Sequence, residues 1–292
     1  MRILAIDIGG TNTKIAIFNR DRSMESGFPV EVKTFTPIEN LLEEILRKYR
    51  NQFDKTGISI AANVNRQGVV VNATNLSVEK NFDLKGFVKK ISGKECKVVN
   101  DGNASAIAVK NMEEFKNFSN IVSATLGTGI GGGIIIDGKI LQSKTGLEAE
   151  IGHIQIEKEG EKCNCGNYGC LEVYCGEKGI VRRFNKVSDK KISSTVELKN
   201  LADRGNKNAV KIIGETGIYL GRAFAMLTNA LAIEVFVLGG GVCGLGNPLI
   251  ETIQSYLRNN CFGSKLGIYP KVKVLKDYKY LSLKGAAELF YE

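Results

Sequence analysis

The feature of this sequence that most constrains its fold is a strand, glycine turn, strand pattern that occurs twice. The first copy runs from Asp7 to Lys14, around Gly9-Gly10-Thr11. The second runs from Leu126 to Ile136 and encloses a longer glycine cluster at 127–132. Apolar strand-like runs on either side of a glycine turn predict a hairpin. A repeated hairpin indicates an internal duplication, so we expect two related halves that face each other across a cleft.

Strand-like and helix-like segments alternate after each hairpin, which predicts an α/β protein with mixed sheets. The expected strands are 57–62, 96–99, 121–126, 133–136 and 234–238, and the expected helices are 41–49, 84–91, 208–232, 283–291 and one that begins at Asn103 or Ala104. We expect an N-terminal domain of residues 1–115, joined by the C-terminal helix 280–292, and a larger C-terminal domain of residues 116–279.

Composition places the chain among ordinary globular proteins. Its 292 residues are 43% hydrophobic and 24% charged, enough for two domains and unlike a disordered chain. No apolar run approaches the roughly 20 residues of a membrane-spanning helix, and Asp7 lies where a signal peptide would keep its apolar core, so we expect a cytoplasmic protein. The net charge of +9 comes from Lys and Arg mixed with Asp and Glu. This mixing argues against nucleic acid and fits an anionic small substrate.

The cysteines gather in one short segment. Four of the seven fall between Cys163 and Cys175, and an odd count without an export signal favours reduced thiols or a metal over a disulfide framework. Cys163, Cys165 and Cys170 form a C-x-C-x4-C array whose three thiolates leave one tetrahedral position of a zinc ion open. By spacing alone, the fourth ligand is either His153, the only histidine in the chain, or Cys175.

A glycine cluster lies at the end of three of the expected strands, at 9–10, 127–132 and 239–241. Glycine allows main-chain N–H groups to approach a phosphate closely. The second cluster matches G-x-G-x-x-G, but a strand follows where the dinucleotide fingerprint requires a helix. A P-loop ending in Gly138-Lys139 fails because Ile140 replaces the magnesium-binding Ser or Thr. Two glycine hairpins remain, able to hold a polyphosphate between them. Their threonine hydroxyls are Thr11, Thr13, Thr125 and Thr128.

Two acids follow expected strands. Asp7 ends the first strand and is a natural outer partner of magnesium. Asp101 follows the strand 96–99 and precedes a helix, so it lies at the edge where α/β sheets bind ligands. At this position an aspartate serves either as a general base or as a helix N-cap.

Six motifs in chain order resemble the ROK family of sugar kinases and repressors, which has the actin-like ATPase (ribonuclease H-like) fold with two domains around a cleft. The motifs are Asp7-Ile8-Gly9-Gly10-Thr11, Asn100-Asp101, Leu126 to Gly133, Glu150-Ile151-Gly152-His153, the cysteine array through Glu172, and Leu238 to Gly241. The resemblance implies an ATP-dependent kinase that phosphorylates the 6-hydroxyl of a hexose or N-acetylhexosamine.

The resemblance also implies roles for individual residues. Asp101 becomes the catalytic base. The implied ATP-binding residues are Asp7, Gly9, Gly10, Thr11, Asn12, Gly127, Thr128, Gly129, Gly131, Gly132, Gly239 and Gly240. The implied sugar-binding residues are Asn75, Asn100, Glu150, His153 and Glu172. A structural zinc ion is expected on His153, Cys163, Cys165 and Cys170, magnesium accompanies ATP, and the expected assembly is a homodimer.

The loop after strand 57–62 departs from the family's glucokinases, which commonly carry a Pro-Gly turn and a Val-Asp pair there. This chain reads Asn63-Val64-Asn65-Arg66-Gln67-Gly68. N-acetylmannosamine kinases of the family are similar in lacking that turn and in length, so the sequence favours N-acetylmannosamine over glucose and a place in sialic acid breakdown. A ROK-type repressor would need a helix-turn-helix before Asp7, and an inactive sugar-binding module would not need Asp101 and both glycine turns.

Overall fold

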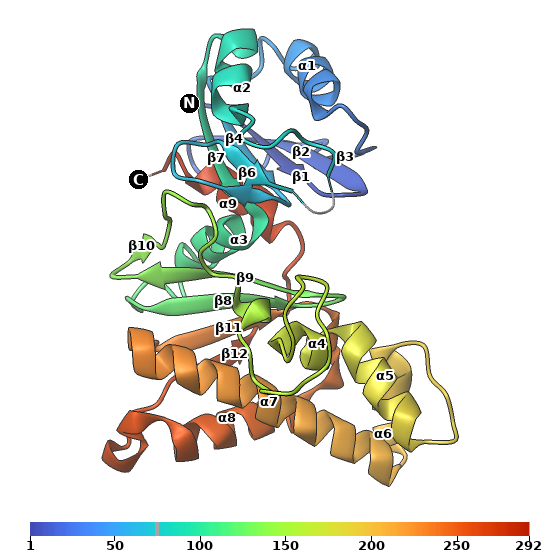
Figure 1. Cartoon of the computed structure of the whole chain (residues 1–292). Coiled ribbons are helices and arrows are strands. Elements are labelled where there is room, and N and C mark those ends of the chain that lie inside the picture. Colours follow the sequence, from blue (N-terminus) through green and yellow to red (C-terminus); the bar gives the residue numbers. More distant parts are fainter. Residues whose placement is uncertain (74–75, 292) are drawn as a thin grey trace. The chain divides into compact units, whose positions relative to one another are not determined.

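The structure is a computed structural model that describes residues 1–73 and 76–291 (Figure 1). By its internal contacts the chain divides into two compact units. Unit 1 comprises Met1–Asn117, Ile140–Glu148 and Lys279–Glu292, and unit 2 comprises Phe118–Lys139 and Ala149–Tyr278. Within the described residues, each unit is built on a five-stranded sheet of its own.

The sheet of unit 1 has the strand order β3-β2-β1-β4-β7. Its strands are β1 (Ile3–Ile8), β2 (Asn12–Phe18), β3 (Val30–Lys33), β4 (Lys55–Ile60) and β7 (Glu95–Asn100). The first three are antiparallel, whereas β1, β4 and β7 run parallel. The register aligns Ile8 with Ile60 and Ile60 with Asn100, so the carboxyl ends of these strands meet at one edge. That edge carries Asp7 and Asn100.

Alternating side chains of β1 face the two sides of this sheet. Leu4, Ile6 and Ile8 join the cluster that buries α1 (Ile38–Lys48) and α2 (Leu84–Ser92). Ile3 and Ala5 belong to the opposite cluster, with α9 (Leu281–Glu288). Figure 1 shows α9 against the sheet beside α3 (Asp101–Lys110). The C-terminal helix therefore packs back onto the N-terminal sheet.

Glycines allow α9 to approach its neighbours closely. A Cβ at Gly285 would overlap the carbonyl oxygen of Ala104 in α3, and a Cβ at Gly57 in β4 would overlap the carbonyl oxygen of Ala286. Both obstacles are backbone atoms, which no side-chain rotation can move away. The close fit of α9 therefore depends on the absence of side chains at these two positions.

We expect Gly285→Ala to destabilise the protein by about 1–3 kcal/mol, the range typical of an overpacked core. Gly214→Ala is the matched control, because Gly214 lies inside α7 (Lys207–Leu231) with no described atom within 4 Å of a built Cβ. Alanine at position 214 should be neutral or stabilise the helix by up to about 1 kcal/mol. Urea unfolding of both variants measures the difference, and equal effects would contradict the close packing.

A small separate hairpin contains the loop in which the sequence departs from the glucokinase pattern. Its strands are β5 (Asn63–Val64) and β6 (Val70–Asn72). Between them, Asn65 Oδ1 accepts hydrogen bonds from the N–H groups of Gln67 and Val69, at 3.0 and 3.1 Å. The guanidinium group of Arg66 donates to the carbonyl oxygen of Gln142. The loop is thus held by its own asparagine and by the segment 140–148.

The sheet of unit 2 repeats the plan of unit 1, with the strand order β10-β9-β8-β11-β12. Its strands are β8 (Ile121–Leu126), β9 (Ile130–Ile136), β10 (Lys139–Ile140), β11 (Val235–Gly239) and β12 (Lys271–Val274). As in unit 1, a glycine hairpin pairs two antiparallel strands, and the first of them continues the sheet through two parallel strands. The predicted internal duplication is therefore confirmed in the sheet topology.

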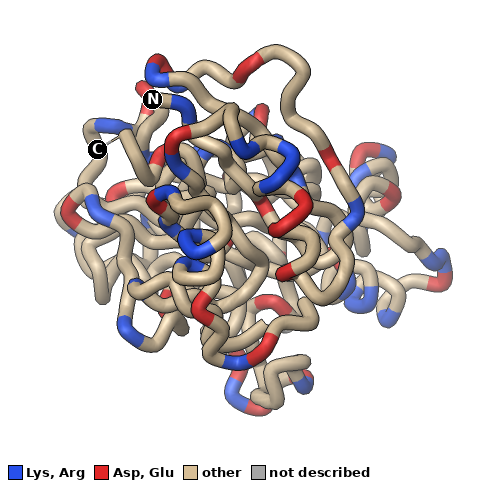
Figure 2. Tube along the Cα trace, turned by 90° about the horizontal axis from the view of Figure 1, so that it is seen from above, with Lys and Arg blue, Asp and Glu red and all other residues tan. Residues whose placement is uncertain are grey.

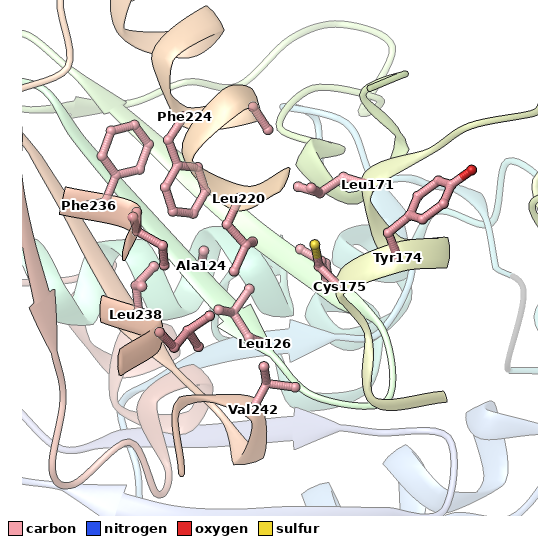
Figure 3. Close-up of a cluster of buried hydrophobic side chains, with 14 of the residues drawn as sticks. Ala124, Leu126, Leu171, Tyr174, Cys175, Leu220, Phe224, Phe236, Leu238 and Val242 are labelled. Atoms are coloured by element: carbon pink, nitrogen blue, oxygen red, sulfur yellow. The ribbon is translucent and has the colours of Figure 1, made fainter. Parts of the chain in front are cut away.

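Helices of unit 2 bury an extensive apolar core. They are α4 (Leu171–Cys175), α5 (Glu177–Val187), α6 (Thr195–Asp203), α7 and α8 (Asn247–Asn260). Phe224 of α7 stacks on Phe236 of β11 with 4.2 Å between ring centroids. Figure 3 shows Leu171 and Cys175 of α4 in this core, together with Leu126 at the end of β8. The short helix that follows the cysteine array is thereby anchored to the sheet.

Several element boundaries differ from the predicted ones, and two of these differences concern the second glycine cluster and Asp101. β9 begins at Ile130 rather than Gly133, because Gly131 and Gly132 pair with Thr125 and Ala124 across the hairpin. α3 begins at Asp101 rather than at Asn103 or Ala104. The side chain of Asn100 caps this helix, so the N-cap position belongs to Asn100 and not to Asp101.

Charged residues are interleaved along the chain rather than separated by sign, as Figure 2 shows with basic residues in blue and acidic residues in red. This distribution agrees with the sequence pattern. In the part of the chain that the structure describes, no helix is both long enough and apolar enough to cross a membrane.

Candidate active site

The first glycine turn, Gly9–Asn12, lies between β1 and β2 at the carboxyl-end edge of the parallel strands of the unit 1 sheet. The N–H of Gly9 donates to the carbonyl oxygen of Asn12 at 3.1 Å, which closes the turn. Gly10 and Thr11 at its tip are exposed. The tip therefore presents main-chain groups and one hydroxyl to the solvent, the arrangement that a phosphate-binding turn requires.

Thr13 supports this turn from the protein interior, through Thr34. It is fully buried, and its hydroxyl lies 2.9 Å from that of Thr34. The Thr34 hydroxyl in turn donates to the carbonyl oxygen of Gly9 at 2.7 Å. The expectation that Thr13 faces a ligand is therefore wrong, because β2 turns this side chain toward β3. Thr11, Thr125 and Thr128 are exposed.

Asp7 lies behind the first glycine turn with most of its carboxylate buried. Ser59 Oγ donates to Asp7 Oδ1 at 2.9 Å, and Lys14 Nζ lies 3.9 Å from Oδ2. Burial raises the pKa of Asp7, and the Ser59 hydrogen bond and the Lys14 charge oppose this shift. The folded state therefore holds the Asp7 proton more tightly than the unfolded chain, whose aspartate pKa is about 3.9. The stability that protonated Asp7 contributes is therefore present below the pKa of the unfolded chain and is lost as the pH rises through the raised pKa of the folded state.

We expect Asp7→Asn to raise the free energy of unfolding at pH 7 in the absence of nucleotide. The ionised carboxylate is a net cost to folding at that pH, and an amide of the same shape avoids it. The gain should shrink as the pH falls toward 4, where wild-type Asp7 becomes protonated. Chemical denaturation between pH 4 and 8 measures both trends. A variant that is less stable than wild type by the same amount at every pH would contradict the argument.

Asn100 and Asp101 follow β7 at the same edge of the sheet. Asn100 Oδ1 accepts the N–H of Asn103 at 2.6 Å, which leaves the amide nitrogen of Asn100 as the group able to donate to a ligand. Asp101 is the first residue of α3 and is exposed, and its Oδ1 accepts the N–H of Gly102 at 2.9 Å. The helix start thus holds the Asp101 carboxylate at the surface, where it can reach a bound molecule.

The second glycine turn, Gly127–Ile130, joins β8 and β9 in unit 2. The N–H of Gly127 donates to the carbonyl oxygen of Gly129 at 2.9 Å, and Thr128 is exposed at the tip. Ile130 donates its N–H to Glu172 Oε2 at 2.9 Å. Glu172 therefore contacts this turn directly, a contact that the sequence did not predict. Within β9, Gly131 is exposed whereas Gly132 is buried.

The third glycine turn, Gly239–Gly241, follows β11. The register places Gly239 opposite Thr125, so this turn and the second one share an edge of the unit 2 sheet. Gly240 has a φ of 97°, and a Cβ there would overlap the backbone of Leu126. Only glycine allows this close approach of β11 to the end of β8.

His153, Cys163, Cys165 and Cys170 form a compact Cys/His cluster in unit 2. Their ligand atoms all lie within 4.8 Å of one another. Cys163 Sγ lies 3.6 Å from His153 Nδ1, and Cys165 Sγ lies 3.7 Å from Cys170 Sγ. Zinc–sulfur bonds of about 2.3 Å in a tetrahedron separate the ligands by about 3.8 Å. The donor set and its spacing therefore fit a structural zinc ion.

Cys175 lies apart from this cluster. It is fully buried, its Sγ contacts the carbonyl oxygen of Thr216 at 3.7 Å, and burial raises the pKa of its thiol. Of the two candidate fourth ligands that spacing left open, the structure brings His153 to the three cysteines. Glu150 is exposed and precedes the short 3₁₀ helix Ile151–His153. Asn75, predicted to bind the sugar, lies outside the described residues.

Comparison with known proteins shows the family of the chain. The family model described as the ROK family matches residues 3–292, so the chain belongs to the ROK family. Glucokinase of Thermotoga maritima is 28% identical over 292 residues and 90% of each chain. N-acetylmannosamine kinase of Vibrio cholerae is 29% identical over 264 residues, 89% of this chain and 90% of the relative.

A crystal structure of a ROK family glucokinase from Streptomyces griseus, in complex with glucose and AMPPNP, superposes with a TM-score of 0.78. The two proteins are 25% identical, and the match covers 99% of each chain. The fold is the actin-like ATPase fold, as the sequence predicts. These comparisons place the chain among the sugar kinases of the ROK family.

Proposed function

We propose that this protein is an ATP-dependent sugar kinase that phosphorylates the 6-hydroxyl of N-acetylmannosamine. The observation that carries the kinase assignment is the duplication of an exposed glycine hairpin at equivalent edges of two sheets, with Asp101 at the same sheet edge as the first hairpin. Main-chain N–H groups of such turns bind phosphate oxygens. The kinase names of the curated relatives support the same reaction class.

In the proposed reaction, Asp101 accepts the proton of the sugar 6-hydroxyl. The hydroxyl oxygen forms a bond to the γ-phosphorus, the bond from that phosphorus to the β-phosphate bridging oxygen breaks, and ADP leaves. Mg²⁺ bound with ATP would neutralise phosphate charge, and Asp7 is its proposed outer partner in the protein. The remaining proposed ATP contacts are Gly9, Gly10, Thr11, Asn12, Gly127, Thr128, Gly129, Gly131, Gly132, Gly239 and Gly240.

The sugar is proposed to bind Asn75, Asn100, Glu150, His153 and Glu172. Carboxylates suit neighbouring hydroxyl groups because each oxygen offers acceptor sites. His153 turns Nδ1 toward Cys163, which leaves Nε2–H to donate to a sugar oxygen. A zinc ion on the Cys/His cluster would hold the imidazole in that tautomer and orientation, without taking part in the transfer.

The choice of N-acetylmannosamine rests on the loop at 61–68, which includes β5 and most of the turn that leads to β6. Curated relatives of both substrate classes are similar to this chain to nearly the same degree, 28% for a glucokinase and 29% for an N-acetylmannosamine kinase. Overall identity therefore does not separate the two sugars. The loop at 61–68 has no Pro-Gly turn, and Asn65 and Arg66 hold its shape instead. Glucose is the alternative substrate.

A comparison of sugars offered separately tests this proposal. ATP-dependent ADP release should be measured with N-acetylmannosamine, glucose, N-acetylglucosamine, mannose and fructose, each alone at equal concentration. We expect the highest kcat/KM with N-acetylmannosamine. A preference for glucose would show that the loop does not select the sugar, and silence with every sugar would overturn the kinase assignment. Sedimentation of the same preparation tests the proposed homodimer.

A further inference from the structure

Both segments that carry the Cys/His cluster contact one residue of the second glycine turn, Ile130. Glu172 lies two residues after Cys170, in the only full turn of α4, and its Oε2 accepts the N–H of Ile130 at 2.9 Å. Gly152, which precedes His153, lies so close to the carbonyl oxygen of Ile130 that a Cβ would overlap it. Glu172 therefore contacts the N–H of Ile130 and Gly152 packs against its carbonyl oxygen, and both residues lie within two positions of a cluster residue.

The carboxylate of Glu172 also limits the position of the turn itself. A Cβ built on Gly129 would lie 2.5 Å from Glu172 Oε2, so the backbone of Gly129 rests against this carboxylate. Five residues further along, the N–H of Glu177 donates to the carbonyl oxygen of Gly127 at 2.8 Å. The segment 172–177 thus supports the turn at both ends, and a shift of this segment would carry the turn with it.

The cluster links the two supporting segments, in addition to the apolar core that Ile151 and Leu171 share. Residues 154–170 contain little regular structure, with isolated bridges at Gln155 to Cys170 and Lys162 to Tyr168. One backbone hydrogen bond, from the N–H of Leu171 to the carbonyl oxygen of Ile154 at 2.9 Å, joins the start of α4 to the segment after His153. A metal ion shared by His153 and Cys170 would fix this junction far more firmly, because metal binding in such sites stabilises the local fold.

We propose that Glu172 is a positioning residue for the second glycine turn, and that through it the Cys/His cluster sets the affinity for nucleotide. This inference rests on the proposed function, in which that turn binds ATP phosphates. Glu172 Oε2 is engaged by Ile130, so Oε1 is the oxygen left for a sugar hydroxyl. One side chain would then connect the metal, the sugar and the phosphate turn.

The test is a thermodynamic cycle on the affinity for Mg-ADP, measured by calorimetry without sugar. The four samples are wild type and Glu172→Ala, each loaded with zinc and each treated with a chelator. We expect Glu172→Ala to weaken Mg-ADP binding about tenfold, as for the loss of one hydrogen bond to a charged group. In wild type, chelation of zinc should weaken Mg-ADP binding at least as much as the substitution Glu172→Ala does. In Glu172→Ala, chelation should weaken Mg-ADP binding much less, because the substitution has already released the contact that zinc supports.

Matched variants separate the contact from general damage. Glu172→Gln keeps a carbonyl acceptor for the Ile130 N–H and should bind Mg-ADP within about threefold of wild type. Glu159→Ala removes an exposed carboxylate from the segment between His153 and Cys163, and should leave Mg-ADP affinity within about twofold. Gly129→Ala displaces the Glu172 carboxylate without removing it and should weaken nucleotide binding while the zinc content stays that of wild type.

Hydrogen exchange supplies a readout that needs no nucleotide. The Ile130 amide should exchange faster in Glu172→Ala and in chelated wild type than in zinc-loaded wild type. Unchanged exchange, wild-type Mg-ADP affinity in Glu172→Ala, or an equal effect of chelation on both proteins would overturn the inference while the kinase assignment stands. If zinc-loaded wild type binds no Mg-ADP, the proposed function fails and the inference fails with it.

Discussion

Asp101→Asn is expected to lower kcat for sugar phosphorylation by about 10²- to 10⁴-fold, the range typical for loss of a general base. The amide keeps the size of the side chain and an oxygen acceptor for the Gly102 N–H, but it cannot take the proton of the sugar hydroxyl. Because Asp101 is exposed at the first position of α3, the substitution should change the stability of unit 1 by less than about 0.5 kcal/mol. Initial rates and urea unfolding of the same preparation provide both numbers.

Asn100→Ala is the informative comparison for this prediction. It removes the cap of α3, so it should cost about 1 kcal/mol of stability as well as sugar affinity. The two variants therefore separate two defects. Asp101→Asn should lower kcat while the affinities for sugar and nucleotide are retained, as expected for lost proton transfer. Asn100→Ala should instead weaken the start of α3 and the binding of the sugar. If Asp101→Asn turned over at a rate near that of wild type, another residue would have to accept the proton.

Cys163→Ser is expected to abolish stoichiometric zinc binding and to lower the melting temperature substantially. Cys163 is buried and lies 3.6 Å from His153 Nδ1, so serine there leaves the Cys/His cluster with three ligands around a closed site. Structural zinc ions in small domains contribute on the order of 10 kcal/mol to folding, and part of that should be lost here. Metal analysis of the purified protein and calorimetric melting measure the two effects.

Cys175→Ala is the control for this experiment. It also changes a buried cysteine, but one whose Sγ contacts Thr216 in the core of unit 2 rather than the cluster. We expect this variant to keep the zinc content of wild type and to lose only the stability of a small core truncation, about 1 kcal/mol. Zinc loss in Cys175→Ala together with zinc retention in Cys163→Ser would reverse the ligand assignment.

Local patterns in the sequence were sufficient for the main elements of both sheets. A strand that ends in a glycine turn is recognisable within about ten residues, because alternation and the conformational freedom of glycine act over short distances. The same holds for Asp101 at the end of β7 and for the array from Cys163 to Cys170. The repeat of the hairpin then predicted the duplication that the two sheet orders confirm.

Errors arose where a partner lies far along the chain. The glycine hairpin predicts a ligand-facing hydroxyl at Thr13, but the pairing of β2 with β3 places this hydroxyl against Thr34. The hydrogen bond from Ser59 to Asp7 joins residues 52 positions apart, through the parallel pairing of β1 and β4. No short-range pattern signals such a contact. The only indication in the sequence is that Ser59 lies within the expected strand 57–62.

The sequence by itself determined the fold class, the three glycine turns and the set of metal-binding residue types, because each depends on residues close together in the chain. Spacing left the fourth member of the Cys/His cluster open and the family resemblance implied His153, whereas only the tertiary structure shows which residue lies beside the three cysteines and what Glu172 contacts. His153 joins the cysteines and Cys175 does not, because α4 turns Cys175 into the core. Glu172 reaches Ile130 across 42 residues because the packing of α4 on the sheet brings it beneath the second glycine turn. Contacts of this kind are set by how elements pack, and packing is a property of the whole folded unit.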